Sequence, residues 1–93
     1  MSSSVRVACH ESSDGWACRV TVGDDPGATS HEVTVTRPML ARLRPDDDAP
    51  DALVADSFAF LLAHEPRESI LRSFELTEIG RYFAGWESEI RRS

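Results

Sequence analysis

The sequence contains no lysine, so all ten of its positively charged side chains are arginines. Its longest apolar run, residues 58–63, is far shorter than the roughly 20 apolar residues that a membrane-spanning helix needs. Glycine-rich phosphate loops are missing, and no serine or cysteine has a nucleophile-elbow context. These absences argue against a transmembrane helix and leave no motif for nucleotide binding or acyl hydrolysis.

Acidic side chains outnumber basic ones, and the net charge is −6 at neutral pH. Such a charge disfavours nonspecific attraction to phosphate backbones and to anionic lipids. We therefore expect no membrane partner, and we regard nucleic acid as a poor one. Residues 1–4 are not followed by an apolar segment of the kind that signal peptides contain. We accordingly expect a cytoplasmic protein.

A chain of 93 residues with 41% hydrophobic and 28% charged residues is typical of one globular domain. We expect this single domain to span residues 1–93. Its parts are a β-meander over residues 1–36, a helical part over residues 37–86 and a tail over residues 87–93. Most bulky apolar side chains lie between residues 51 and 83, so we expect the core to form around that stretch.

Two N-terminal stretches alternate between apolar and polar side chains, as half-buried strands do. They cover residues 4–10 and 16–22, and a turn-forming loop at residues 12–15 joins them. A hairpin that pairs Val5 with Val22 puts every apolar residue of both strands on one face. A shift by one residue would pair apolar with polar side chains, so the pattern selects this register.

The two cysteines, Cys9 and Cys18, lie directly opposite each other in this register. We predict inward-facing, reduced thiols, because free cysteines are frequently buried and the cytoplasm is reducing. A redox pair is one alternative, and a zinc site that adds His31 is another, although structural zinc needs four converging ligands. His10 and His64 are isolated in the sequence, so no catalytic group is predicted around them.

A third alternating stretch, residues 31–36, puts Val33 and Val35 on the inner face. Three consecutive strands with short connections predict an antiparallel meander, whose apolar face the later helices must cover. The expected fold class is α+β: a three-stranded antiparallel β-meander followed by three to four helices packed on one face of the sheet. The other face of the sheet should stay open and polar.

Helical signals begin at Thr36, a suitable N-cap with Pro38 in the first turn of the helix that follows. This helix should end near Arg44, because the next residue is a proline. A second and more apolar helix is predicted over residues 49–64, with Asp48 as its cap.

Two further helices are predicted, over residues 66–73 and about 76–84, with Gly85 as the C-terminal cap of the second. The residues of the first of these helices that should face the core are Ile70, Leu71 and Phe74.

The apolar pattern over residues 49–86 resembles that of a group of short bacterial hypothetical proteins of no known function. The segments that carry the resemblance are Leu53-Val54, Ser57-Phe58-x-Phe60-Leu61-Leu62, Glu65-Pro66-x-Glu68-Ser69-Ile70-Leu71 and Phe74-x-Leu76-x-x-Ile79-x-Arg81-Tyr82-Phe83. The resemblance implies a folded domain and brings with it no activity, cofactor or site residue.

Residues 66–83 have the length of a helix-turn-helix, and residues 76–81 loosely resemble the turn and the start of a recognition helix. A helix that reads DNA directs cations toward the phosphates. The outward positions here are Glu75, Glu78 and Arg81, a mainly acidic set. This composition favours two packed core helices over a DNA-binding motif.

The C-terminal aromatic and apolar side chains are the best candidates for a partner surface. Tyr82, Phe83, Trp86 and Ile90 follow one another at positions i, i+1, i+4 and i+8, next to arginines. Aromatic residues and arginine are the usual anchors of protein interfaces. We therefore predict a contact surface centred on Trp86, formed by Arg81, Tyr82, Trp86, Ile90 and Arg91. The alternative is a tail that packs on its own core.

The sequence favours a small cytoplasmic, non-catalytic protein-interaction or regulatory module, with a protein partner or a second copy of the chain as the contact and no cofactor. It identifies no catalytic, cofactor-binding or metal-binding residue. One alternative is a nucleic-acid-associated, antitoxin-like regulator that uses the helix-turn-helix-like segment 66–83. A second alternative is a small enzyme or a metal-binding protein.

Overall fold

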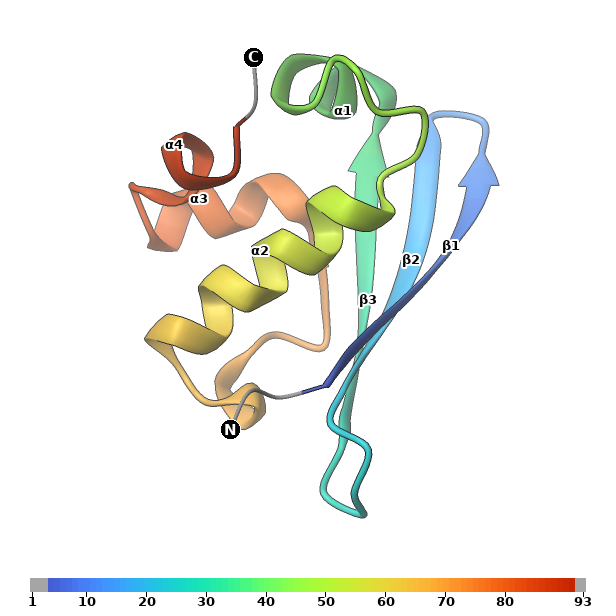
Figure 1. The fold of residues 1–93 in the computed structure, drawn as a ribbon. Coiled ribbons are helices and arrows are strands. Elements are labelled where there is room, and N and C mark those ends of the chain that lie inside the picture. Colours follow the sequence, from blue (N-terminus) through green and yellow to red (C-terminus); the bar gives the residue numbers. More distant parts are fainter. Residues whose placement is uncertain (1–3, 92–93) are drawn as a thin grey trace.

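The computed structural model describes residues 4–91, which form an α+β fold with the helices gathered on one side of a sheet (Figure 1). The strands are β1 (Val5–Ser12), β2 (Gly15–Val22), β3 (Thr29–Thr36) and β4 (Ser73–Glu75). The α-helices are α1 (Arg37–Leu43), α2 (Asp51–His64), α3 (Ile79–Tyr82) and α4 (Trp86–Ile90). Two 3₁₀ turns, η1 (Arg67–Ser69) and η2 (Leu76–Glu78), complete the described elements.

The hairpin of β1 and β2 has the register that the sequence predicts, with Val5 opposite Val22. Its turn is tighter than expected, because Ser12 already pairs with Gly15. A Cβ atom at Gly15 would collide with the backbone carbonyl of Val35 on β3. Glycine therefore lets β2 and β3 approach closely beside the turn.

The sheet differs from the expected three-stranded one, because a fourth strand makes it mixed. The order is β1-β2-β3-β4, and β4 pairs with β3 in parallel. Phe74 lies opposite Val33, and the backbone N–H of Glu32 donates to the carbonyl of Arg72 at 2.7 Å. The connection through α1, α2 and η1 brings β4 back beside β3 in the parallel direction, as crossover connections do.

The core lies between the sheet and α2. Phe58 of α2 is fully buried, and its ring lies 5.4 Å from that of His31 and 6.1 Å from that of Phe74. The outer face of the sheet is open, as predicted, with exposed polar side chains such as Arg19 and Glu32, which form a 2.8 Å ion pair.

The first two helices follow the sequence closely. The hydroxyl of Thr36 accepts a 3.3 Å hydrogen bond from the backbone N–H of Met39, which confirms Thr36 as the N-cap of α1. The predicted cap at Asp48 is wrong: α2 begins at Asp51, and Pro50 precedes it without a side-chain cap.

The predicted helix over residues 66–73 is wrong. Only η1 forms there, and the chain then extends into β4. Ile70 is consequently buried while its neighbour Leu71 is exposed, since an extended chain alternates its side chains between two sides. The helix-turn-helix expected over residues 66–83 is therefore not formed, because half of it runs through a turn and a strand.

After β4 the chain turns through η2, where a capping box replaces the expected helix start. The side chain of Glu78 accepts a 2.9 Å hydrogen bond from the backbone N–H of Glu75. Gly85 does not cap the preceding helix, because it directly precedes α4. Of the predicted tail, residues 87–91 include most of α4, and residues 92–93 lie outside the described residues.

The cysteines lie opposite each other as predicted, and Cys18 is fully buried. The expectation of reduced thiols is wrong, because Cys9 and Cys18 form a disulfide. Their Cα atoms are 4.0 Å apart. The expectation assumed a reducing cytoplasm, whereas the strand register itself brings the two sulfur atoms together.

Candidate functional site

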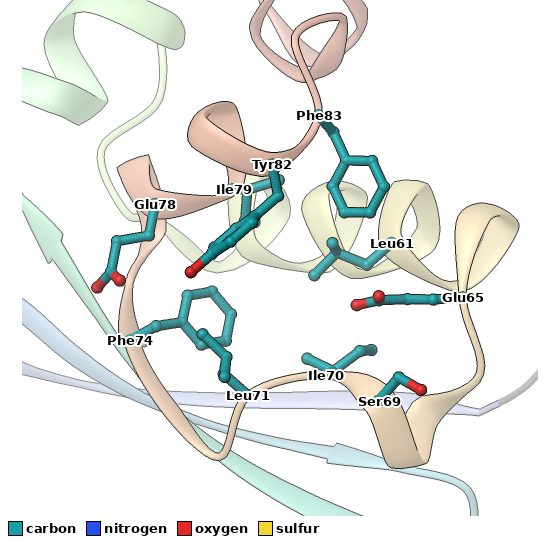
Figure 2. A pocket seen from close by; sticks show the side chains of 10 residues that line it. All are labelled: Leu61, Glu65, Ser69, Ile70, Leu71, Phe74, Glu78, Ile79, Tyr82 and Phe83. Carbon is teal, nitrogen blue, oxygen red and sulfur yellow. The ribbon is translucent and has the colours of Figure 1, made fainter.

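A hollow of about 320 Å³ opens beside β4, between the C-terminal end of α2, the chain from η1 to β4, and α3 (Figure 2). We call it the Tyr82 groove. It is lined by Leu61, Glu65, Ser69, Ile70, Leu71, Phe74, Glu78, Ile79, Tyr82 and Phe83. Its volume is at the lower end of the range for small-ligand sites.

The floor of the Tyr82 groove belongs to the core, while two apolar side chains on its rim face solvent. Leu61 and Ile79 are buried beneath it. Leu71 is 49% exposed and Tyr82 is 68% exposed, and both line the groove (Figure 2). No other large hydrophobic side chain among residues 4–91 is exposed to this degree. Exposed apolar side chains that gather around a hollow indicate a binding surface, whereas scattered ones do not.

The exposure of Leu71 depends on a buried histidine of β3. A 2.7 Å hydrogen bond joins Nδ1 of His31 to the carbonyl oxygen of Leu71, and the carbonyl can only accept, so Nδ1 donates. Nε2 of the same ring lies 2.9 Å from the hydroxyl of Thr29. His31 thus fixes the backbone at Leu71 from inside the protein, while the Leu71 side chain points outward.

Two carboxylates stand at opposite sides of the Tyr82 groove. The Glu78 carboxylate is engaged by the backbone N–H of Glu75. The Glu65 side chain points into the groove in Figure 2 and forms no hydrogen bond or ion pair with the described part of the chain. Its backbone N–H donates to the carbonyl of Leu61 at 2.8 Å, so Glu65 directly follows the last turn of α2.

An aromatic cluster borders the groove on the side of α2. The ring of Phe83 lies 5.9 Å from that of Phe60 and 5.2 Å from that of His64. These three rings pack on one another and line a second hollow, which shares Tyr82 and Phe83 with the Tyr82 groove. The cluster therefore extends the apolar surface around Tyr82.

Of the partner surface that the sequence predicts, some residues are buried and others are exposed. Trp86 and Ile90 are buried, at 1% and 4% exposure, so a surface centred on Trp86 is a wrong prediction. The C-terminal residues pack on the core because α4 lies against α2, and the indole N–H of Trp86 donates to the hydroxyl of Ser57 at 3.0 Å. Arg81, Tyr82 and Arg91 are exposed, and of these three Tyr82 lines the groove.

Sequence reasoning missed Leu71 and Glu65 as possible site residues. The sequence places Leu71 in the core because it predicts a helix over residues 66–73. Glu65 merely follows the helix predicted over residues 49–64, so the sequence gives no reason to single it out. No local pattern could reveal the groove, because its walls come from three segments that only the fold brings together.

The described residues offer no group of three or more histidine, cysteine or acidic side chains that could hold a metal ion. The zinc site considered for Cys9, Cys18 and His31 is contradicted, because the cysteines are bonded to each other and His31 holds Leu71 and Thr29. No helix within residues 4–91 has both the length and the apolar character needed to cross a membrane.

No protein-family model matches the chain, and the searches found no matching curated protein and no matching solved structure. The function of the protein is therefore inferred from the geometry of the molecule alone.

Proposed function

We propose that the protein is a small, non-catalytic interaction module that binds an apolar segment of a partner protein in the Tyr82 groove. The observation that carries this proposal is the position of Leu71 and Tyr82, which are both exposed and both line one hollow. An isolated protein gains nothing from holding two large apolar side chains in water, whereas a docked segment would bury them.

The surroundings of the groove support a protein segment as the ligand. The floor is apolar, and the rim carries a phenol, a serine hydroxyl and carboxylates, which matches the apolar centre and polar rim of protein interfaces. The side chains that line the groove come from α2, from the stretch between η1 and β4, and from η2 and α3 (Figure 2), so a docked segment would contact several elements at once.

A comparison of protein variants tests this proposal. The groove variant combines Leu71→Ser with Tyr82→Ser, and the control combines Ala8→Ser with Ala17→Ser on the exposed outer face of the sheet. All four side chains are exposed, so both variants should keep a chemical-denaturation midpoint close to that of the wild type.

The wild type and both variants serve as bait in extracts of the host, and each retained protein is then purified and titrated directly by calorimetry. A partner that docks in the groove should bind the control like the wild type and bind the groove variant at least about tenfold more weakly, because two interface anchors are lost. If every captured protein binds the groove variant as tightly as the wild type, the groove is not the docking surface.

A further inference from the structure

The Tyr82 groove has an electrostatic preference as well as an apolar one. Of the ten residues that line it, all of which lie in the described part of the chain, two are glutamates and none is an arginine. The buried and partly buried arginines elsewhere have carboxylate partners, as with Arg44 and Asp56 or Arg67 and Asp25. Arg81 is adjacent to Tyr82 in the sequence but does not line the groove.

Glu65 is the group on which this preference centres. Its side chain is partly buried, points into the groove and forms no hydrogen bond or ion pair with residues 4–91 (Figure 2). It also follows the last residue of α2, a helix of 14 residues whose C-terminal end carries partial negative charge. A carboxylate at this place is repelled by the helix end, and a bound cation would relieve that repulsion.

We infer that the segment which docks in the Tyr82 groove carries a lysine or arginine beside its apolar anchor, and that the Glu65 carboxylate receives this cation. The inference rests on the proposed function and names the chemistry of the partner. Leu71 and Tyr82 contact the apolar side chain, while Glu65 pairs with the charge at the other end of the groove. The carboxylate of Glu78 contributes less, because it already accepts a hydrogen bond from the backbone of Glu75.

Two matched peptides test the charge requirement. The first is acetyl-Leu-Leu-Arg-Leu-amide, and the second replaces its arginine with citrulline, a neutral side chain of nearly the same shape. Each is titrated into the isotope-labelled full chain while the backbone amide signals of Leu71, Phe74 and Tyr82 are followed by NMR. The arginine peptide should bind about threefold to fivefold more tightly at low salt, the size of effect usual for a partly exposed ion pair, and the difference should shrink in high salt.

The variant Glu65→Gln keeps the shape of the side chain and removes its charge. With this variant, the arginine and citrulline peptides should bind with equal affinity. The control is Asp51→Asn, which removes the same charge from the opposite end of α2 and should leave the difference intact. If the difference persists in Glu65→Gln, or disappears equally in Asp51→Asn, Glu65 is not the receiving group.

The remaining outcomes separate this inference from the proposed function. Equal binding of both peptides in the groove overturns the cation requirement and leaves the groove as a docking surface. Groove signals that respond to neither peptide at millimolar concentration overturn the inference, and the bait experiment then decides the proposed function on its own. Groove signals that shift with protein concentration alone would mean that a second copy of the chain occupies the groove, which also overturns the inference.

Discussion

The indole N–H of Trp86 donates a 3.0 Å hydrogen bond to the hydroxyl of Ser57, and both side chains are almost completely buried. The Ser57 hydroxyl in turn donates to the carbonyl of Leu53 at 2.8 Å within α2. This contact attaches α4 to α2 and satisfies the one polar atom of the tryptophan side chain. It explains why the C-terminal aromatic residue belongs to the core.

Replacement of Ser57 by alanine should lower the free energy of unfolding by about 1–3 kcal/mol, because the buried indole N–H loses its acceptor. The loss is measured by urea denaturation followed by tryptophan fluorescence. In a Trp86→Phe background, which has no indole donor, the same serine replacement should cost clearly less. Equal costs in both backgrounds would show that the hydrogen bond does not contribute.

Replacement of Phe58 by alanine should destabilise the protein by about 3–5 kcal/mol, since the ring is fully buried between α2 and the sheet. A domain of this size has only about 5–15 kcal/mol of stability, so the variant should be partly or wholly unfolded at room temperature. Circular dichroism and a denaturant titration measure this directly. A midpoint equal to that of the wild type would contradict the packing described for Phe58.

Arg44 should contribute more to the free energy of unfolding than Arg42, although both side chains form ion pairs. Arg44 is 2% exposed, and its guanidinium donates to the carbonyl of Ile90 at 2.7 Å and to Asp56 at 2.6 Å. Arg44→Met removes the donor to that carbonyl and should cost about 1–3 kcal/mol.

The matched control is Arg42→Met in the last turn of α1, which Arg44 directly follows. The Arg42 guanidinium pairs with Glu87 while nearly half exposed, and such pairs contribute about 0.2–1 kcal/mol. Denaturant titrations of the two variants give the comparison. A larger loss for Arg42→Met than for Arg44→Met would contradict the role assigned to Arg44.

The disulfide between Cys9 and Cys18 can be tested by thiol titration. Protein prepared without reductant and then denatured should show no titratable thiol, because Cys9 and Cys18 are bonded to each other. Reduction should lower the free energy of unfolding by about 2–3 kcal/mol, the amount that chain entropy gives for a loop closed between residues nine apart. Two titratable thiols in the denatured, unreduced protein would contradict the Cys9–Cys18 bond.

Local patterns in the sequence determined the first half of the fold. Alternation of apolar side chains selected the hairpin register of Val5 with Val22, because a shift by one residue would expose every apolar group. Thr36 and Pro38 determined the start of α1, since capping and the first helical turn depend only on neighbouring residues. The apolar composition of residues 49–64 likewise identified the helix that covers the sheet.

Tertiary structure decided the second half. Residues 66–75 contain apolar side chains at spacings that suit a helix, yet backbone hydrogen bonds to β3 hold the end of this stretch as β4. Backbone pairing with a strand 40 residues earlier leaves no mark in the local pattern, and it turned Leu71 outward while Ile70 stayed inside. The burial of Trp86 and the walls of the Tyr82 groove have the same origin, because both require contacts between segments whose sequences carry no information about one another.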